Sequence, residues 1–173
     1  MPSQCLNEIA GVENKLIVSI GSLAVSNDPN DRLTTFSLGS CLGVAIYDPV
    51  VRAGGLLHAM LPSSSINPAR AAERPAMFVD AGVAALFRAC YELGADKRRL
   101  RICVAGGAHF MDKSNFFNIG LRNYQQFRDI LRQHGLAIAA EEVGGWVSRT
   151  VQLNIRTGEV RLKTSGQNSE TIL

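Results

Sequence analysis

Short apolar segments separated by turn-forming residues recur along the chain, and this pattern predicts a protein built largely from β-strands. Several of these segments are rich in β-branched residues, and two of them end at a proline. The expected strands are 15–21, 42–47, 54–61, 100–105, 136–141, 150–155 and 159–163. Between the last two, Arg156-Thr157-Gly158 predicts a tight hairpin turn.

Two longer segments have the periodicity of amphipathic helices. Residues 76–93 and 121–134 each place their apolar side chains on one face, and Gly94 and Gly135 follow as stop signals. The turn formers of 26–31 predict a loop, and the prolines and serines of 63–75 predict a mobile loop.

This order of elements predicts an α/β fold of mixed or antiparallel sheets, sandwich-like and flanked by two main helices. Hairpin-like spacing early and late in the chain argues against a doubly wound parallel sheet. The length of 173 residues fits one domain. We expect that domain to be 15–163, between polar tails at 1–14 and 164–173 that are frayed or bind a partner.

Composition narrows the class of protein. With 18 Lys and Arg against 15 Asp and Glu, the net charge of +3 gives no support for nucleic-acid binding. No signal peptide is visible, and no apolar run reaches the roughly 18 residues of a membrane span. We therefore expect a soluble cytoplasmic protein with no membrane insertion, whose four cysteines are reduced.

Cys41 has the setting of a nucleophile. It ends the sequence Ser37-Leu-Gly-Ser-Cys41, where Gly39 and Ser40 can form a sharp turn that exposes a thiol and frees main-chain N–H groups. The alternative is a small buried residue beside a strand. His58, in a neighbouring apolar segment, could take the proton of the thiol.

Such an imidazole needs an acceptor that orients it. Thr35 and Thr34 precede Cys41, and Asp48 follows it, so all three are candidates for this role.

The other thiols and imidazoles carry weaker signals. Cys90 and Cys103 are expected in the core and Cys5 in a tail, while His109 follows a Gly-Gly break and His134 ends a helix. The cysteines form no zinc motif, and the glycine-rich segments 104–108 and 142–146 match no phosphate-binding loop. The residues thus predict no metal and no cofactor.

Several strings, taken together, resemble the CheD family of bacterial chemotaxis proteins, which are chemoreceptor glutamine deamidases. Their order and spacing carry the likeness over about 15–163. The strings are Thr35-Phe-Ser-Leu-Gly-Ser-Cys41, Ala45-Ile-Tyr-Asp-Pro49, Gly54-Gly-Leu-Leu-His-Ala-Met-Leu-Pro62, Ala105-Gly-Gly-Ala108, Asn118-Ile-Gly-Leu-Arg-Asn123, Gly144-Gly145 and Asn154-Ile-Arg-Thr-Gly158.

The resemblance implies a catalytic set of Cys41, His58 and Thr35, and sheets flanked by helices in a fold shared with toxin deamidases. It implies a protein-glutamine glutaminase that converts glutamines of methyl-accepting chemoreceptors to glutamate, with a CheC-type phosphatase as a further partner. An alternative is a non-catalytic regulator that binds receptors or CheC. A redox thiol sensor would need a resolving cysteine near Cys41, and the scattered cysteines provide no obvious one.

Overall fold

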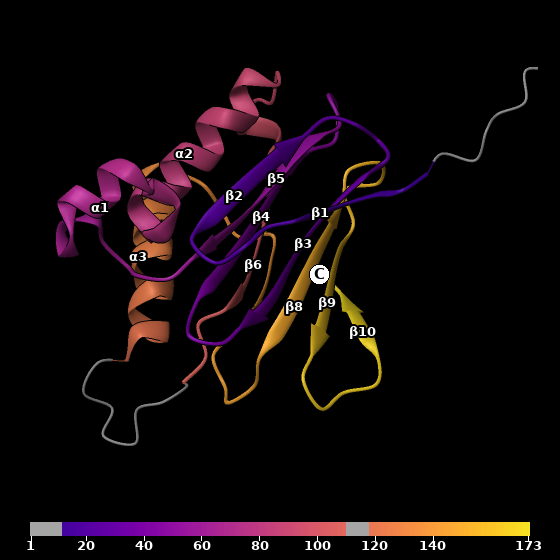
Figure 1. The fold of residues 1–173 in the computed structure, drawn as a ribbon. Coiled ribbons are helices and arrows are strands. Elements are labelled where there is room, and N and C mark those ends of the chain that lie inside the picture. Colours follow the sequence, from indigo (N-terminus) through magenta and orange to yellow (C-terminus); the bar gives the residue numbers. More distant parts are fainter. Residues whose placement is uncertain (1–11, 110–117) are drawn as a thin grey trace, which may run out of the picture.

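The computed structural model describes residues 12–109 and 118–173, which form two five-stranded β-sheets and three α-helices (Figure 1). The first sheet has the order β1 (Asn14–Ile17), β3 (Asp31–Leu38), β8 (Arg149–Asn154), β9 (Val160–Thr164) and β10 (Glu170–Ile172). The second has the order β2 (Ser22–Ser26), β5 (Ala53–Ala59), β4 (Leu42–Asp48), β6 (Arg101–Gly106) and β7 (Ala140–Val143). Each sheet has one parallel pair, β1 with β3 and β6 with β7, and is otherwise antiparallel.

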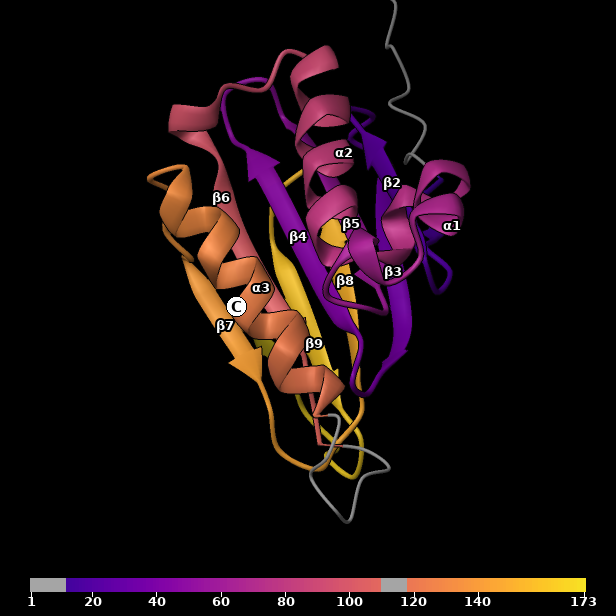
Figure 2. The same cartoon turned by 90° about the vertical axis from the view of Figure 1, so that its left-hand side faces the viewer.

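The elements stack in three layers. Helices α2 (Val79–Glu92) and α3 (Ile119–Gln133) cover one face of the second sheet (Figure 2), while the first sheet packs on its other face. One hydrophobic core lies between helices and sheet, and a second lies between the two sheets. The predicted α/β architecture of mixed sheets is confirmed, and both main helices lie on the same side of it.

Strands β4 and β5 separate the two cores and are buried along their whole length. Successive side chains of a strand point to opposite faces. On β5, Leu57 and Ala59 therefore join the core beneath the helices, and Leu56 joins the core between the sheets. By the same alternation, the side chain of His58 points between the sheets.

The segment 63–75 differs from the predicted loop. It contains a 3-10 turn at Ser64–Ile66 and helix α1 (Pro68–Glu73), and a second 3-10 turn follows at Pro75–Met77. The Asn67 side chain accepts a hydrogen bond from the Arg70 N–H, and Pro68 occupies the first turn of α1. A proline at this position starts a helix instead of breaking one, because its missing N–H has no partner there anyway.

The two ends of the chain were expected to be tails. Residues 1–11, including Cys5, lie outside the described residues. At the other end, 164–173 is not frayed throughout, because β10 pairs with β9 in antiparallel register. The division into one domain with two tails remains a prediction.

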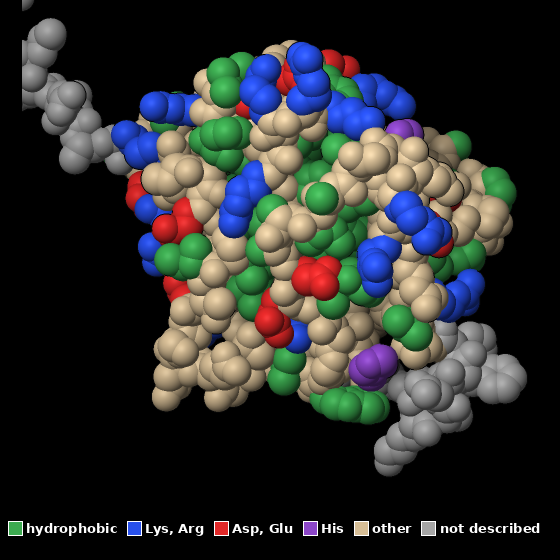
Figure 3. Space-filling model, turned by 180° about the vertical axis from the view of Figure 1, so that it is seen from behind, with side chains coloured by type: hydrophobic (Ala, Val, Ile, Leu, Met, Phe, Trp, Pro, Cys, Tyr) green, Lys and Arg blue, Asp and Glu red, His purple; other side chains and the backbone are tan. Residues whose placement is uncertain are grey.

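The surface fits the modest net charge. On the face shown in Figure 3, Lys and Arg side chains lie along the upper edge and at scattered points elsewhere, among neutral and acidic groups. Within 12–109 and 118–173, no helix is both long and apolar enough to cross a membrane.

Candidate active site

A hydrogen bond between Thr35 and His58 joins the two sheets. Thr35 lies on β3 of the first sheet and His58 on β5 of the second, and both side chains are completely buried. The Thr35 Oγ1 and His58 Nδ1 atoms are 2.7 Å apart.

The partners of Thr35 determine which nitrogen of His58 carries the proton. The Thr35 hydroxyl donates its single proton to the Val18 carbonyl at 2.7 Å, since a carbonyl can only accept. Thr35 must then accept from the His58 Nδ1–H. The neutral imidazole consequently keeps a lone pair on Nε2, which is buried and has no hydrogen-bond partner among the described residues.

Cys41 lies in the turn between β3 and β4, next to the strand that carries His58. The cross-strand partner of His58 is Gly43, two residues after Cys41, while Leu42 packs beneath the helices. Cys41 packs against the core between the sheets and is half-buried. The thiol and the imidazole thus belong to the same layer, and Gly43 adds no side chain opposite His58.

The chain before Cys41 is bent to form this turn. The pairing of β3 with β8 shifts register between Thr35 and Leu38, and Ser37 has a left-handed backbone with φ of 57°. Irregularities of this kind bend a strand and redirect its side chains. They let β3 hold Thr35 in the core and still turn within a few residues to present Cys41.

Neighbouring segments hold the turn in place. The Gly107 N–H donates to the Cys41 carbonyl and the Ala108 N–H to the Gly39 carbonyl, both at 2.8 Å. The main-chain N–H of Cys41 favours the thiolate and lowers the pKa of the thiol, against a larger rise caused by burial. This main-chain donor belongs to the residue that carries the thiol. During attack on a carbonyl group, negative charge develops on the substrate oxygen next to the sulfur, where such donors stabilise it.

The electrostatics favour neutral groups at rest. Burial raises the pKa of the Cys41 thiol above its ordinary value, against a smaller lowering by its own N–H. Burial also lowers the pKa of His58 to about 4. Near neutral pH the thiol and the imidazole are therefore both neutral, and a neutral imidazole is the form that can act as a general base.

The structure separates the three candidates for orienting His58. Thr35 makes the contact, whereas the Thr34 hydroxyl accepts a hydrogen bond from Gln152 at 3.2 Å. Asp48 binds Arg99 and the Asp96 N–H at the far end of β4. Burial alone would raise the pKa of Asp48, but these hydrogen bonds outweigh it and lower the pKa. Asp48 is therefore a structural anchor.

The other two thiols in the described part of the chain are buried, as predicted. Cys90 lies in the core beneath the helices and Cys103 in the core between the sheets. Burial raises the pKa of Cys90 to about 12 and raises that of Cys103 as well. Both are poor nucleophiles compared with the half-buried Cys41.

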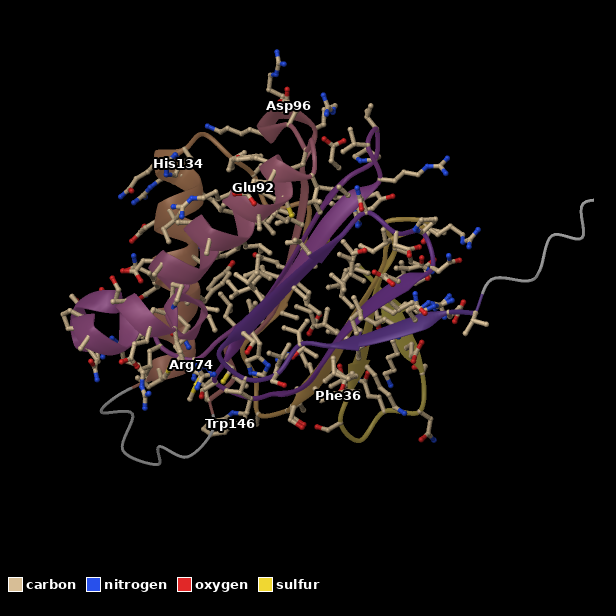
Figure 4. The ribbon with its side chains drawn as sticks, turned by 45° about the horizontal axis from the view of Figure 1, so that its top comes forward. Phe36, Arg74, Glu92, Asp96, His134 and Trp146 are labelled. Carbon is tan, nitrogen blue, oxygen red and sulfur yellow. The ribbon has the colours of Figure 1, made fainter. Side chains whose placement is uncertain are left out.

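His109 and His134 lie far apart. The His109 N–H donates to the Gly145 carbonyl at 2.8 Å, and its ring lies against exposed Trp146. Trp146 and Phe36 lie at one end of the molecule, and His134 lies at the other (Figure 4). His109 thus borders the loops around Cys41, and His134 does not.

Asn123 of α3 was not singled out among the candidate residues. Its side-chain NH₂ group donates hydrogen bonds to the carbonyl oxygens of Ser40 and Met60. Ser40 precedes Cys41, and Met60 follows β5. The signal was present in the sequence, because Asn123 lies four residues before Phe127 and eight before Leu131 on the buried face of the helix.

No group of three or more His, Cys, Asp or Glu side chains within the described part of the chain is arranged to hold a metal ion.

Comparison with known proteins identifies the family. A family model described as CheD chemotactic sensory transduction matches residues 60–164. "Probable chemoreceptor glutamine deamidase CheD 1" of Syntrophus aciditrophicus is 48% identical over 151 residues, 87% of this chain and 94% of its own. "Probable chemoreceptor glutamine deamidase CheD" of Solibacter usitatus is 44% identical over 158 residues, 91% and 94% of the two chains.

The likeness extends to an archaeon. "Probable chemoreceptor glutamine deamidase CheD" of Pyrococcus horikoshii is 40% identical over 159 residues, 90% of this chain and 96% of its own. Among solved structures, Neisseria meningitidis protein NMB0706 of family-model DUF152 superposes with a TM-score of 0.47 at 11% identity. It covers 78% of this chain and 63% of that chain.

The fold and the site define an α/β protein with a thiol and an oriented imidazole in one layer. The matches then fix its family. The chain belongs to the CheD family.

Proposed function

We propose that this protein is a chemoreceptor glutamine deamidase, which hydrolyses glutamine side-chain amides to glutamate and releases ammonia. The relatives' names support the reaction class. One structural observation supports the mechanism most directly. Thr35 holds the protonated Nδ1 of His58, which leaves the Nε2 lone pair without a partner among the described residues, in the layer that contains Cys41.

In the first half of the reaction, His58 Nε2 takes the Cys41 proton while the sulfur bonds to the carboxamide carbon. The oxygen becomes an oxyanion, which the main-chain N–H groups around Ser40 and Cys41 stabilise. His58 then returns the proton to the amide nitrogen. The carbon–nitrogen bond breaks, ammonia leaves, and a thioester to Cys41 remains.

In the second half, His58 takes a proton from water, and the hydroxide bonds to the thioester carbon. When the carbon–sulfur bond breaks, the thiolate recovers the proton from His58. The net change is one glutamine and one water converted to one glutamate and one ammonia, with no electron transfer. These steps require no metal or organic cofactor.

We assign the reaction to the cytoplasm, with glutamines on the exposed helical face of a methyl-accepting chemoreceptor as substrate. A CheC-type phosphatase is the second partner of the proposal. The new carboxylate on the receptor would then be available for methylation.

The test is incubation with a chemoreceptor cytoplasmic fragment, followed by mass spectrometry of Gln-to-Glu conversion. Cys41→Ala and His58→Ala should abolish conversion without unfolding the protein. Thr35→Val should lower kcat about 100-fold, because it removes the hydrogen bond to the imidazole together with the bond to Val18 that orients the hydroxyl, whereas Thr35→Ser should keep most activity.

One control variant and two contrary outcomes make the result decisive. Cys103→Ala removes a buried thiol and should leave conversion intact. Full conversion by Cys41→Ala would refute the covalent mechanism. A wild-type protein that binds receptor or CheC tightly but never converts glutamine would instead be the non-catalytic regulator.

A further inference from the structure

Asn123 links α3 to both halves of the site. It is completely buried, and its Nδ2 donates to the Ser40 carbonyl at 2.9 Å and to the Met60 carbonyl at 3.0 Å. Ser40 immediately precedes Cys41, and Met60 follows the strand that carries His58. One amide therefore connects the turn that carries the thiol with the strand that carries the imidazole.

The orientation of this amide is unambiguous, since both partners are carbonyl oxygens and only its NH₂ group can donate to them. The Asn123 Oδ1 then points elsewhere, is buried, and has no hydrogen-bond partner in the described part of the chain. A buried unpaired acceptor is destabilising. An apolar side chain of similar size would fill the space without that cost, so packing alone does not explain this asparagine.

The peptide bond explains what the asparagine achieves. The Ser40 carbonyl and the Cys41 N–H belong to one planar trans peptide unit, so they point in opposite directions. When Asn123 holds the carbonyl, it also fixes the direction of the N–H. That N–H belongs to the residue that carries the thiol, and it favours the charged form of that thiol.

We propose that Asn123 is a positioning residue, which holds the Ser40–Cys41 peptide against the end of β5 so that the Cys41 N–H serves as an oxyanion donor. The inference rests on the proposed deamidation. Because its side chain is buried, Asn123 acts through the peptide without touching the substrate.

This role predicts a particular kinetic signature. Asn123→Leu keeps the number and branching of the side-chain heavy atoms but removes both donors, which frees the peptide to rotate. Loss of an oriented oxyanion donor costs about 100-fold in kcat. The KM for the receptor fragment should stay within about twofold, since the substrate meets the same surface.

Asn123→Asp gives a second, nearly isosteric variant. Near neutral pH its carboxylate faces two carbonyl oxygens and donates nothing, so kcat should fall at least as far as in Asn123→Leu. A protonated carboxyl group can donate to one of the carbonyls. The ratio of Asn123→Asp to wild-type kcat should therefore rise severalfold from pH 8 to pH 5, while the Asn123→Leu ratio stays constant.

Phe127→Leu is the matched control, because Phe127 is equally buried one turn further along α3. It should lower the melting temperature but change kcat by less than about threefold. Circular dichroism checks the folding of every variant.

Two results would overturn the proposal. One is an unchanged kcat in both Asn123 variants, and the other is an equal loss of kcat in Phe127→Leu. If the wild-type protein itself converts no glutamine, the proposed function has failed instead, and the two failures are thereby distinguished.

Discussion

His58 is a completely buried imidazole, and only one of its ring nitrogens is hydrogen-bonded within 12–109 and 118–173. Burial disfavours its charged form, and no carboxylate among the described residues is hydrogen-bonded to it to compensate. This arrangement lowers the stability of the fold at low pH, and it keeps the His58 imidazole neutral near neutral pH. Both consequences follow from the same pKa of about 4.

The lowered pKa of His58 makes the unfolding free energy depend on pH. In the unfolded chain His58 titrates near 6.5, and in the folded protein near 4. Its contribution to stability is complete above pH 6.5 and is lost as the pH falls from 6.5 to 4, because only the unfolded state gains the proton there. Between pH 7.5 and pH 4.5 the loss from His58 should be about 2.5 kcal/mol of unfolding free energy.

Urea denaturation at several pH values measures this effect in the wild type and in His58→Gln. The glutamine at position 58 has no ionisable group. Other groups titrate alike in both proteins, so their contributions cancel in the comparison. The wild type should lose about 2.5 kcal/mol more than the variant over this range. Parallel pH curves for the two proteins would show that His58 keeps an ordinary pKa in the fold.

The sequence predicted part of this local picture. The turn formers before Cys41 and the isolated His58 in an apolar segment could be recognised from the sequence alone. The choice between Thr35 and Thr34 was not, because it depends on which face of β3 each side chain occupies. The sequence pattern of Asp31–Leu38 did not predict a strand.

At the scale of elements, the end of β6 supports the turn that carries the thiol. Gly106 has a φ of 104°, and a Cβ atom placed there would lie 2.2 Å from the Cys41 carbonyl oxygen. The adjacent Gly107 donates its N–H to that oxygen. The strand end and the turn can approach this closely only because Gly106 has no side chain.

We therefore predict that Gly106→Ala displaces the turn. The added methyl group meets main-chain atoms that cannot rotate away, and the backbone angle is unfavourable for alanine. Unfolding free energy should fall by about 3 kcal/mol or more, and glutamine conversion should fall at least 100-fold.

Gly135→Ala separates these two effects. Gly135, which follows α3, also has a positive φ, of 63°, but nothing lies within 4 Å of a Cβ placed there. This variant should lose only about 1–2 kcal/mol of stability and keep its activity. Equal loss of activity in the two variants would mean that backbone strain, and not contact with the Cys41 turn, is responsible.

The elements themselves were predicted unevenly. Helices α2 and α3 were found because a long amphipathic period is a strong signal. Strand β3 was missed since charged and hydroxyl side chains interrupt its apolar pattern, and β10 was missed because it is short and exposed. In 63–75 the prolines indicated a loop, although the Asn67 cap makes one of them a helix start.

At the scale of the whole molecule, the site depends on how the two sheets pack. Strand β3 brings Thr35 from one sheet and β5 brings His58 from the other. One of the two neighbours of β3 is β8, more than one hundred residues away in sequence. Pairing over such distances leaves little local signal, so hydrophobic patterning predicted the layers without predicting the sheet order.

Two buried valines allow a test of whether the contact between Thr35 and His58 depends on the packing of the sheets. Val151 lies opposite Thr35 on β8 and faces the core between the sheets, whereas Val104 of β6 faces the helices. Both are almost completely buried. Val151→Ala and Val104→Ala should each reduce stability by about 2 kcal/mol through a cavity of similar size. Only the Val151 cavity lies in the layer that sets the distance between Thr35 and His58.

Val151→Ala should therefore lower kcat about tenfold, and Val104→Ala should leave kcat nearly unchanged at a temperature where both proteins are fully folded. The nuclear magnetic resonance of the His58 Nδ1 proton provides an independent measurement, because a longer bond to Thr35 shifts it upfield. Equal kcat in the two variants would mean that β3 and β5 hold Thr35 and His58 together without help from the packing between the sheets.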